Sequence, residues 1–428
     1  MNTTQKNEFR EYGWLIVCIS TLALVVSNGL AILGLPVFYK PMLADLIASG
    51  SIDESTSQTL IGTAAGITLL SAGLLAPIGG WLYRKTSARL MMTIGSVLLG
   101  GGILLYSRAT GAWSVYGAHA LLGLSLVFVG VLVNTVLISE WFVEKRGVAL
   151  GIVLTGTSFG GVLIPPIATP LIGAYGWRTA MLLVSLLVWL VLLPAVVLLV
   201  KNKRREVNAE SALAESIPEE NATTGHQDST GEAIGSLNFW VLGLASALIF
   251  YTIFIVSQQL NLYLQTPAMG YTLAEAGAVQ SRLFMASVAG KFLFGWLSDR
   301  FSSGRVMIAG TALMLFAASV FPVLTPSTIL LFAIPFGLSY GGVFVLIQLQ
   351  AADLFGRKNL ALVLGIITAI ETIGGAAGTR IAGMIADANG GDYRYAFLTL
   401  IPAMLVTVLL AIVLNRRVAK SRVPSSKF

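Results

Sequence analysis

The sequence predicts an all-α membrane protein with twelve transmembrane helices, and three observations lead to this prediction. Of the 428 residues, 56% are hydrophobic and only 11% are charged, whereas soluble domains carry about 25% charged residues. A spanning helix needs about 20 predominantly apolar residues, and twelve apolar runs long enough for this follow one another along the chain. Glycine occurs 45 times, which suits closely packed helices in a membrane.

The apolar runs form two groups of six with a polar break between them. They lie at 14–38, 58–82, 90–107, 113–139, 148–173 and 179–200, and then at 238–262, 274–297, 306–323, 328–352, 360–385 and 395–415. The break is rich in Lys, Arg, Glu and Ser and is too polar to pack a core. We therefore expect an N-terminal six-helix bundle over residues 1–200, a cytoplasmic central loop over 201–236 and a C-terminal six-helix bundle over 237–428.

The 27 basic residues are distributed unevenly around these segments. If the N-terminus is inside, the loops on the opposite side hold only Lys40, Arg108, Arg178 and Arg394, and three more basic residues lie within helices. Because cytoplasmic loops carry an excess of Lys and Arg, we expect a multi-pass protein of the cytoplasmic (inner) membrane with both termini in the cytoplasm. The net charge of +7 is then a topology signal, and no nucleic-acid partner is expected.

The two halves also repeat each other in sequence. Gly80-Trp81-Leu82 precedes a basic turn in the first half, as Gly295-Trp296-Leu297 does in the second. Gly151-Ile152 recurs as Gly365-Ile366 at nearly the same offset along the chain. Parallel repeats of this kind are typical of transporters whose substrate site lies between the halves, near the bilayer midplane.

These features resemble the major facilitator superfamily. The segment from Gly295 through Asp299-Arg300 to Gly304-Arg305 resembles the cytoplasmic loop motif that this superfamily carries between the second and third helices of each half. The N-terminal copy departs from it, because Arg84 stands where the family usually has aspartate. The resemblance implies the major facilitator fold and rocker-switch alternating access.

A narrower resemblance is to the monocarboxylate-porter branch, which includes oxalate/formate-antiporter-like members. It rests on Tyr12-Gly13-Trp14, on the run from Trp141-Phe142 to Gly151-Ile152, and on Pro165-Pro166 with Tyr175-Gly176-Trp177-Arg178. Arg282 falls where the eighth helix of that branch carries a substrate-binding arginine. The branch often has an acid one turn earlier, where this chain has Ala278. Its oxalate exchangers add a lysine in the eleventh helix, where this chain offers Glu371 and Arg380.

Arg282 is the first candidate for substrate binding. A charged side chain at membrane depth is kept when it faces protein or water, so it marks a functional site by default. Its guanidinium can bind a carboxylate through two parallel hydrogen bonds, a geometry that Lys does not offer. The alternative is a structural arginine that pairs with a nearby acid. Asn134 and Tyr340 are further candidates for substrate contact, and each could instead bond only to neighbouring helices.

Glu371 is the only carboxylate placed at mid-span, and it occupies the repeat position of Thr157. It is the candidate for proton coupling or for an ion pair, with a neutral packing acid as the alternative. Lys291, Asp299 and Arg300 are expected to form a cytoplasmic gate or latch. Lys291 is nine residues from Arg282, half a turn around the helix, so the two side chains cannot point into the same cavity.

The sequence therefore predicts a secondary active transporter of small organic monocarboxylates, lactate- or pyruvate-like, with proton coupling. Its expected partners are the organic acid, the proton as co-substrate and the lipid bilayer, and the chain is expected to be monomeric. The alternatives are a carrier of amino acids or other zwitterions, an organic-anion exchanger, and a sensor that kept the fold. An enzyme is not expected, because no nucleophile–base or metal constellation is visible, and no cofactor or metal is predicted.

Overall fold

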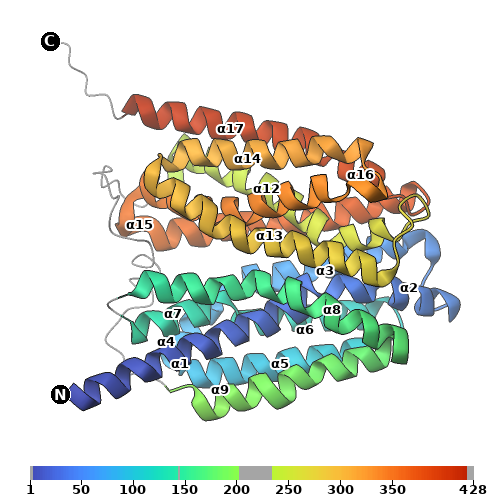
Figure 1. Cartoon of the computed structure of the whole chain (residues 1–428), viewed down its shortest axis with the longest axis horizontal. Coiled ribbons are helices and arrows are strands. Elements are labelled where there is room, and N and C mark those ends of the chain that lie inside the picture. The colour runs from blue at the N-terminus through green and yellow to red at the C-terminus, as the bar shows by residue number, and fades with distance from the viewer. Residues whose placement is uncertain (1–2, 143–144, 202–233, 422–428) are drawn as a thin grey trace.

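The computed structural model describes residues 3–142, 145–201 and 234–421, and every regular element in these ranges is a helix. Figure 1 shows the helices lying side by side along the long axis, with the N-terminal half below and the C-terminal half above. Both chain termini lie at the same end of the bundle, which we call the terminal end. The opposite end is called the far end.

In the N-terminal half, six spans run back and forth between these ends. They comprise α1 (Thr3–Asn28) with α2 (Tyr39–Ala48), α3 (Ser57–Leu74) with α4 (Ala76–Lys85), α5 (Ala88–Ser107), α6 (Ala112–Val129) with α7 (Val131–Trp141), and α8 (Arg146–Leu186) continuing through a π-helical turn into α9 (Leu193–Leu199). The helix α8 reverses direction at Gly176, where φ is 75°, and glycine adopts this left-handed conformation readily. The fifth and sixth spans therefore meet at that glycine.

The C-terminal half repeats this arrangement. It comprises α12 (Leu237–Leu264), α13 (Leu273–Arg300), α14 (Ser303–Val320), α15 (Leu330–Ala388), and α16 (Arg394–Leu398) with α17 (Leu400–Ser421). The long helix α15 breaks at Gly356, where φ is 66°, so it forms the tenth and eleventh spans. The predicted central loop, 201–236, lies almost wholly outside the described residues.

The described helices agree with the twelve predicted spans. Within the described ranges, nine segments are long and apolar enough to cross a membrane, and the bent pair Glu54–Leu74 and Ala76–Lys85 makes ten. One of the nine, Arg146–Leu199, contains two spans because it turns at Gly176. The helix α13 adds the last span. Its charged side chains lower its hydropathy, but its 28 residues are long enough to cross a membrane. The prediction of two six-helix pseudo-repeats is confirmed.

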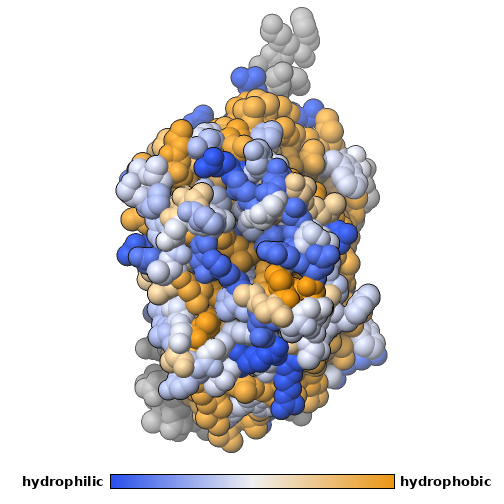
Figure 2. Space-filling view, turned by 90° about the vertical axis from the view of Figure 1, so that its right-hand side faces the viewer, coloured by the Kyte–Doolittle hydropathy of each residue, from blue (hydrophilic) through white to orange (hydrophobic). Residues whose placement is uncertain are grey.

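The surface also fits a membrane protein. Large apolar side chains are exposed along the sides of the bundle, among them Leu190, Leu198, Phe292, Leu331 and Leu409. Figure 2 looks onto the far end and shows polar residues gathered over this end face, with apolar residues around its edges. A belt of apolar side chains between polar end faces is what lipid requires of a spanning bundle.

The two halves meet along two seams, each a helix pair in close contact. In one seam α3 packs against the second part of α15, and a Cβ on Gly62 would collide with the backbone of Thr379. In the other seam α8 packs against α13, and a Cβ on Gly161 would collide with the ring of Phe284. Small residues thus let the helices of opposite halves approach each other closely.

Candidate functional site at the interface of the halves

Lys291 projects from α13 into the seam between α8 and α13. Its ammonium donates a hydrogen bond to the carbonyl oxygen of Leu154 over 3.0 Å and another to Oγ1 of Thr157 over 2.6 Å. Both acceptors belong to the other half of the chain. No carboxylate among the described residues forms a salt bridge with Lys291. One turn away, the hydroxyls of Ser287 and Ser158 lie 3.2 Å apart and join the same two helices.

Arg282 lies on the opposite face of α13. The exposed side chains of this helix recur at Ala278, Arg282, Met285, Ala289 and Phe292, and this spacing defines one helical face. Lys291 is nine residues from Arg282, which at about 100° per residue is half a turn. The structure therefore brings Lys291, and not Arg282, to the interface of the halves. No geometry on the exposed face tests the predicted substrate role of Arg282.

Glu371 lies in the other seam, on the part of α15 that packs against α3. Its side chain is only 7% exposed, and it makes no hydrogen bond or ion pair with another described residue. Glu371 lies about five helical turns before the end of α15 at Ala388, and Lys291 lies about five turns after the start of α13 at Leu273. At about 1.5 Å per residue, both groups lie about 25 Å from the far end. They lie at about the same level, one in each of the two seams.

Aromatic rings lie beside Lys291 within the C-terminal half. The Lys291 ammonium is 5.7 Å from the centroid of the Phe344 ring on α15. Phe344 is 6.4 Å from Phe250 on α12, and Phe250 is 5.8 Å from Phe254, measured between ring centroids. A Cβ on Gly375, one turn beyond Glu371, would touch the ring of Phe254. This row of three rings thus runs from Lys291 towards the second part of α15, beyond Gly356, which carries Glu371.

The other predicted contact residues differ in their surroundings. Asn134 is fully buried, and its amide donates to the carbonyls of Val129 and Gly130, where the break between α6 and α7 leaves acceptors unpaired. Tyr340 is half-buried, packs edge-on against Phe284 at 6.2 Å between centroids, and makes no hydrogen bond with a described residue. Tyr340 therefore keeps a hydroxyl available at the interface, whereas the Asn134 amide already bonds the backbone.

The three predicted gate or latch residues lie at different depths along α13. Asp299 and Arg300 are exposed at its terminal end, and the Arg300 guanidinium lies over the ring of Trp296 at 4.4 Å. Lys291 lies two turns deeper, in the seam described above. The structure does not bring the three residues together, and their function as a gate or latch remains a prediction.

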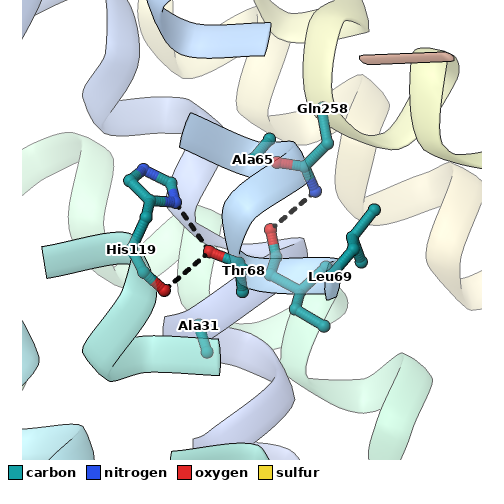
Figure 3. A pocket seen from close by; sticks show the side chains of 7 residues that line it. Ala31, Ala65, Thr68, Leu69, His119 and Gln258 are labelled. Carbon is teal, nitrogen blue, oxygen red and sulfur yellow. Dashed lines mark hydrogen bonds between the residues drawn. The ribbon is translucent and has the colours of Figure 1, made fainter. Parts of the chain in front are cut away.

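A further group of polar residues, towards the far end, surrounds a small pocket lined by Ala31, Ile32, Ala65, Thr68, Leu69, His119 and Gln258. Figure 3 shows the hydroxyl of Thr68 between the ring and the backbone of His119, 2.8 Å from Nδ1 and 3.1 Å from the carbonyl oxygen. The Gln258 amide reaches across from α12 to the carbonyl oxygen of Ile32. Within the described residues, no group of histidine, cysteine and acidic side chains has the arrangement of a metal site.

Comparison with known proteins agrees with this architecture. The model of the Major Facilitator Superfamily matches residues 16–280 and 235–428, which together cover nearly the whole chain. The chain belongs to the Major Facilitator Superfamily. A solved structure of this fold, a bacterial homologue of the human lysosomal transporter Spinster in an inward-facing, unoccupied conformation, superposes with a TM-score of 0.69. It covers 98% of this chain and 99% of that one at 16% identity, so it supports the fold alone.

Within the Major Facilitator Superfamily, the chain is similar to monocarboxylate transporters. It is 26% identical to monocarboxylate transporter 13 of Rattus norvegicus over 394 residues, which are 90% of this chain and 85% of the relative. It is 25% identical to monocarboxylate transporter 12 of Xenopus laevis over 345 residues, covering 77% and 74% of the two chains. The resemblance to the monocarboxylate-porter branch is confirmed.

Two features of the interface were not predicted from the sequence. The sequence identifies Thr157 only as the repeat counterpart of Glu371, and the structure shows it as a partner of Lys291. Gln280 has no distinguishing sequence pattern of its own, yet it is buried and bonds the other half. The sequence did contain a signal for the neighbouring donor Gln258, because Pro36 has no N–H for the carbonyl of Ile32, four residues earlier, and Gln258 bonds that carbonyl.

Proposed function

We propose that this chain transports small organic monocarboxylates by alternating access, and that Lys291 binds the substrate's carboxylate. The observation that carries the proposal is a cation in the seam between the halves without an acidic partner among the described residues. An ammonium has three N–H donors, and Leu154 and Thr157 occupy two of them. A carboxylate on the third would neutralise a charge that is unfavourable at membrane depth.

The apolar part of the substrate would lie along the row of rings formed by Phe344, Phe250 and Phe254. A carboxylate on the Lys291 ammonium places its first carbons close to the Phe344 ring, which is 5.7 Å from that nitrogen. Burying apolar atoms against these rings contributes about 25 cal/mol for each Å² removed from water. A single cation beside an aromatic surface suits an acid with one charge and an apolar body.

Glu371 is proposed as the proton-coupling group. It is buried, lies at the level of Lys291 and makes no ion pair with another described residue. A carboxyl group in such a place can exchange its charge by binding a proton. Each transport cycle would then carry one proton on Glu371, in the seam of α3 with α15, and one carboxylate on Lys291, in the seam of α8 with α13.

The zwitterion alternative is less favoured by this arrangement. Glu371 lies in the seam of α3 with α15, whereas Lys291 lies in the seam of α8 with α13, and no salt bridge joins them. An α-amino acid bears its ammonium and its carboxylate on one carbon, so it could not contact both groups at once. An organic-anion exchanger would use the same Lys291 site without a role for Glu371 as a proton carrier.

The decisive experiment is uptake into proteoliposomes of labelled lactate, pyruvate, longer and aromatic monocarboxylates, a dicarboxylate and an amino acid, with and without an inward proton gradient. The variants are Lys291→Gln and Glu371→Gln, with Arg282→Gln as a control on the opposite face of the same helix. We expect Lys291→Gln to abolish monocarboxylate uptake and Arg282→Gln to retain most of it. The reverse result would reject the Lys291 site and favour Arg282.

The same uptake measurements distinguish proton symport from exchange and from amino-acid transport. If the gradient drives accumulation in wild type but not in Glu371→Gln, the proton-coupling hypothesis stands. Uptake that ignores the gradient and needs a counter-substrate inside would make the protein an exchanger. Preference for amino acids would make it a zwitterion carrier.

We further propose that the terminal end faces the cytoplasm of a cell whose inner membrane holds the protein as a monomer. The support is the excess of Lys and Arg in the loops at that end, in line with the positive-inside rule. Labelling of single cysteines in intact cells, placed in the loops after α5 and after α4, would test the orientation. Reagents confined to the outside should reach only the loop after α5.

A further inference from the structure

The first span is interrupted within the membrane. The helix α1 ends at Asn28, a π-helical turn follows over Gly29–Leu33, and a 3-10 turn over Leu35–Phe38 leads into α2. In a regular helix, the carbonyl of Ile32 would accept from the N–H of the residue four positions later. That residue is Pro36, which has no N–H, so this hydrogen bond cannot form. Backbone at membrane depth that lacks its own partners is tolerated only where protein or water supplies them.

Two glutamines from the other half supply these partners. The Gln258 amide on α12 donates to the carbonyl oxygen of Ile32 over 3.1 Å, and the Gln280 amide on α13 donates to that of Leu33 over 2.9 Å. The two glutamine side chains are 3% and 1% exposed. The carbonyl groups of the interrupted first span are therefore held by side-chain donors of the C-terminal half.

The same contacts extend into a hydrogen-bonded chain that returns to the first span. Gln280 accepts from Asn261 over 3.3 Å, and Asn261 Oδ1 accepts from Gln265 over 2.7 Å. The carbonyl oxygen of Gln265 accepts from the Lys40 ammonium over 2.7 Å. The chain thus leaves the first span at Leu33 and rejoins it at Lys40, on either side of the 3-10 turn.

Tyr39 adds a second bond to Gln258. Its hydroxyl donates to Gln258 Oε1 over 2.7 Å, and the Tyr39 side chain is fully buried. Gln258 therefore uses both ends of its amide on the N-terminal half, as an acceptor from Tyr39 and as a donor to Ile32 (Figure 3 shows the latter contact). These bonds exist only while the two halves are in contact on this side of the membrane.

We propose that Gln258 and Gln280 are the positioning residues that hold the far side of the interface closed, by bonding the carbonyl groups of Ile32 and Leu33 in the interrupted first span. This inference rests on the alternating access proposed above, in which the far side must open once in each cycle. Opening transfers the two carbonyls from the glutamine amides to water. The balance between the closed and open states then depends on these amides, because their bonds contribute to one state alone.

Gln259 provides a matched control within the same chain. It is the neighbour of Gln258, is fully buried, and donates to the backbone carbonyl of Thr379 over 2.8 Å. Thr379 belongs to the same half as Gln259. Replacing Gln259 by leucine therefore also deprives a buried carbonyl of its donor, but it removes no hydrogen bond between the halves.

The experiment measures how fast a maleimide labels a reporter cysteine on the far side. The sequence has one cysteine, Cys18, so Cys18→Ser gives a background without thiols, and Ala65→Cys places the reporter in the buried pocket beside Gln258. Gln258→Leu, Gln280→Leu and Gln259→Leu are compared in this background, in detergent and without substrate. We expect labelling about fivefold faster in the first two, as the loss of one hydrogen bond predicts, and an unchanged rate in Gln259→Leu.

Equal rates in all three variants, or no acceleration in Gln258→Leu and Gln280→Leu, would overturn the proposal. Tyr39→Phe serves as a milder variant that removes only the bond to Gln258 Oε1, and a smaller acceleration is expected from it. Labelling needs neither substrate nor Lys291. If the labelling pattern holds while no monocarboxylate is transported, the role of Gln258 and Gln280 in closing the far side stands and the proposed substrate is wrong. If monocarboxylates are transported but the labelling pattern is absent, only the role of the two glutamines is rejected.

Discussion

Lys291 donates a hydrogen bond to Thr157, and Thr157 occupies in the N-terminal half the repeat position that Glu371 occupies in the C-terminal half. The two seams are thus related by the internal repeat but carry different chemical groups. One holds a cation with a neutral hydroxyl partner, and the other holds a carboxyl group without a charged partner. This asymmetry allows an anion to bind in one seam while a proton binds in the other.

Thr157→Glu tests the first half of this relationship. A carboxylate at this position would lie within reach of Lys291 and would occupy the cation that the substrate needs. We expect uptake of monocarboxylates to fall at least about tenfold, since the substrate would have to displace a hydrogen bond between charged groups, which contributes about 1.5–3 kcal/mol. Proteoliposome uptake measures the effect.

Thr157→Val is the control for that substitution, because it removes the hydroxyl without adding charge. It should lower uptake much less than Thr157→Glu. Equal losses in the two variants would mean that Lys291 is needed only as a structural partner of α8, and the carboxylate site would have to be placed elsewhere.

Phe344→Ala tests the role of the aromatic row. Removing the ring nearest Lys291 should raise the KM for monocarboxylates with long or aromatic tails by about tenfold, the size expected when an apolar contact of about one to three kcal/mol is lost. The KM for a two- or three-carbon acid should change little. Uptake kinetics across a series of chain lengths gives the comparison.

Phe316→Ala controls for the loss of a phenyl ring. Phe316 is 54% exposed on α14 and lies away from the seams. A similar change of KM in both variants, or a change in Phe344→Ala that is independent of tail length, would contradict binding of the tail along these rings.

The sequence predicted the helices well because each span is a long apolar run. The run 274–297 became α13 at Leu273–Arg300, and the run 238–262 became α12 at Leu237–Leu264. The choice of helix face was harder. Arg282 and Lys291 stand half a turn apart on α13, and a helix that is apolar on most sides gives no pattern to show which face meets protein and which meets lipid.

The partners of Lys291 and Gln280 could not be predicted for a further reason. Lys291 bonds Thr157 across 134 residues, and Gln280 bonds Leu33 across 247. Such contacts depend on how two bundles dock, which hydropathy and local propensity do not describe. The internal repeat did place Thr157 and Glu371 in equivalent positions. The sequence therefore predicted that the two residues correspond to each other, but it did not predict which groups each of them contacts.

Gly62→Ala tests the close approach in the seam of α3 with α15. A methyl group at Gly62 would collide with the backbone of Thr379, so α3 and α15 would have to move apart. We expect a loss of about 1–3 kcal/mol in the closed state, seen as faster labelling of the far-side reporter and slower transport. Gly101→Ala in α5, where a Cβ would meet open space, should leave both unchanged, and an equal effect there would exclude this explanation.

Asp387→Ala tests a contact at the far end that is specific to this seam. The Asp387 carboxylate, near the end of α15, accepts from the backbone N–H of Gln58 over 3.0 Å and from that of Thr59 over 2.7 Å. It thereby caps the first turn of α3 in the other half, where the N–H groups have no partner within the helix. Loss of such a cap costs about 1 kcal/mol, and here it would be lost from the closed state alone.

We therefore expect Asp387→Ala to accelerate labelling of the far-side reporter about fivefold. Asp392→Ala is the matched control, because Asp392 accepts from the N–H of Arg394 within its own half. If both variants label at the wild-type rate, the cap does not bias the closure of the far side. If both accelerate equally, the effect comes from a weaker C-terminal half and not from the bond between halves. Acceleration in Asp387→Ala alone would show that a carboxylate from one half and a helix N-terminus from the other stabilise the closed far side in addition to Gln258 and Gln280.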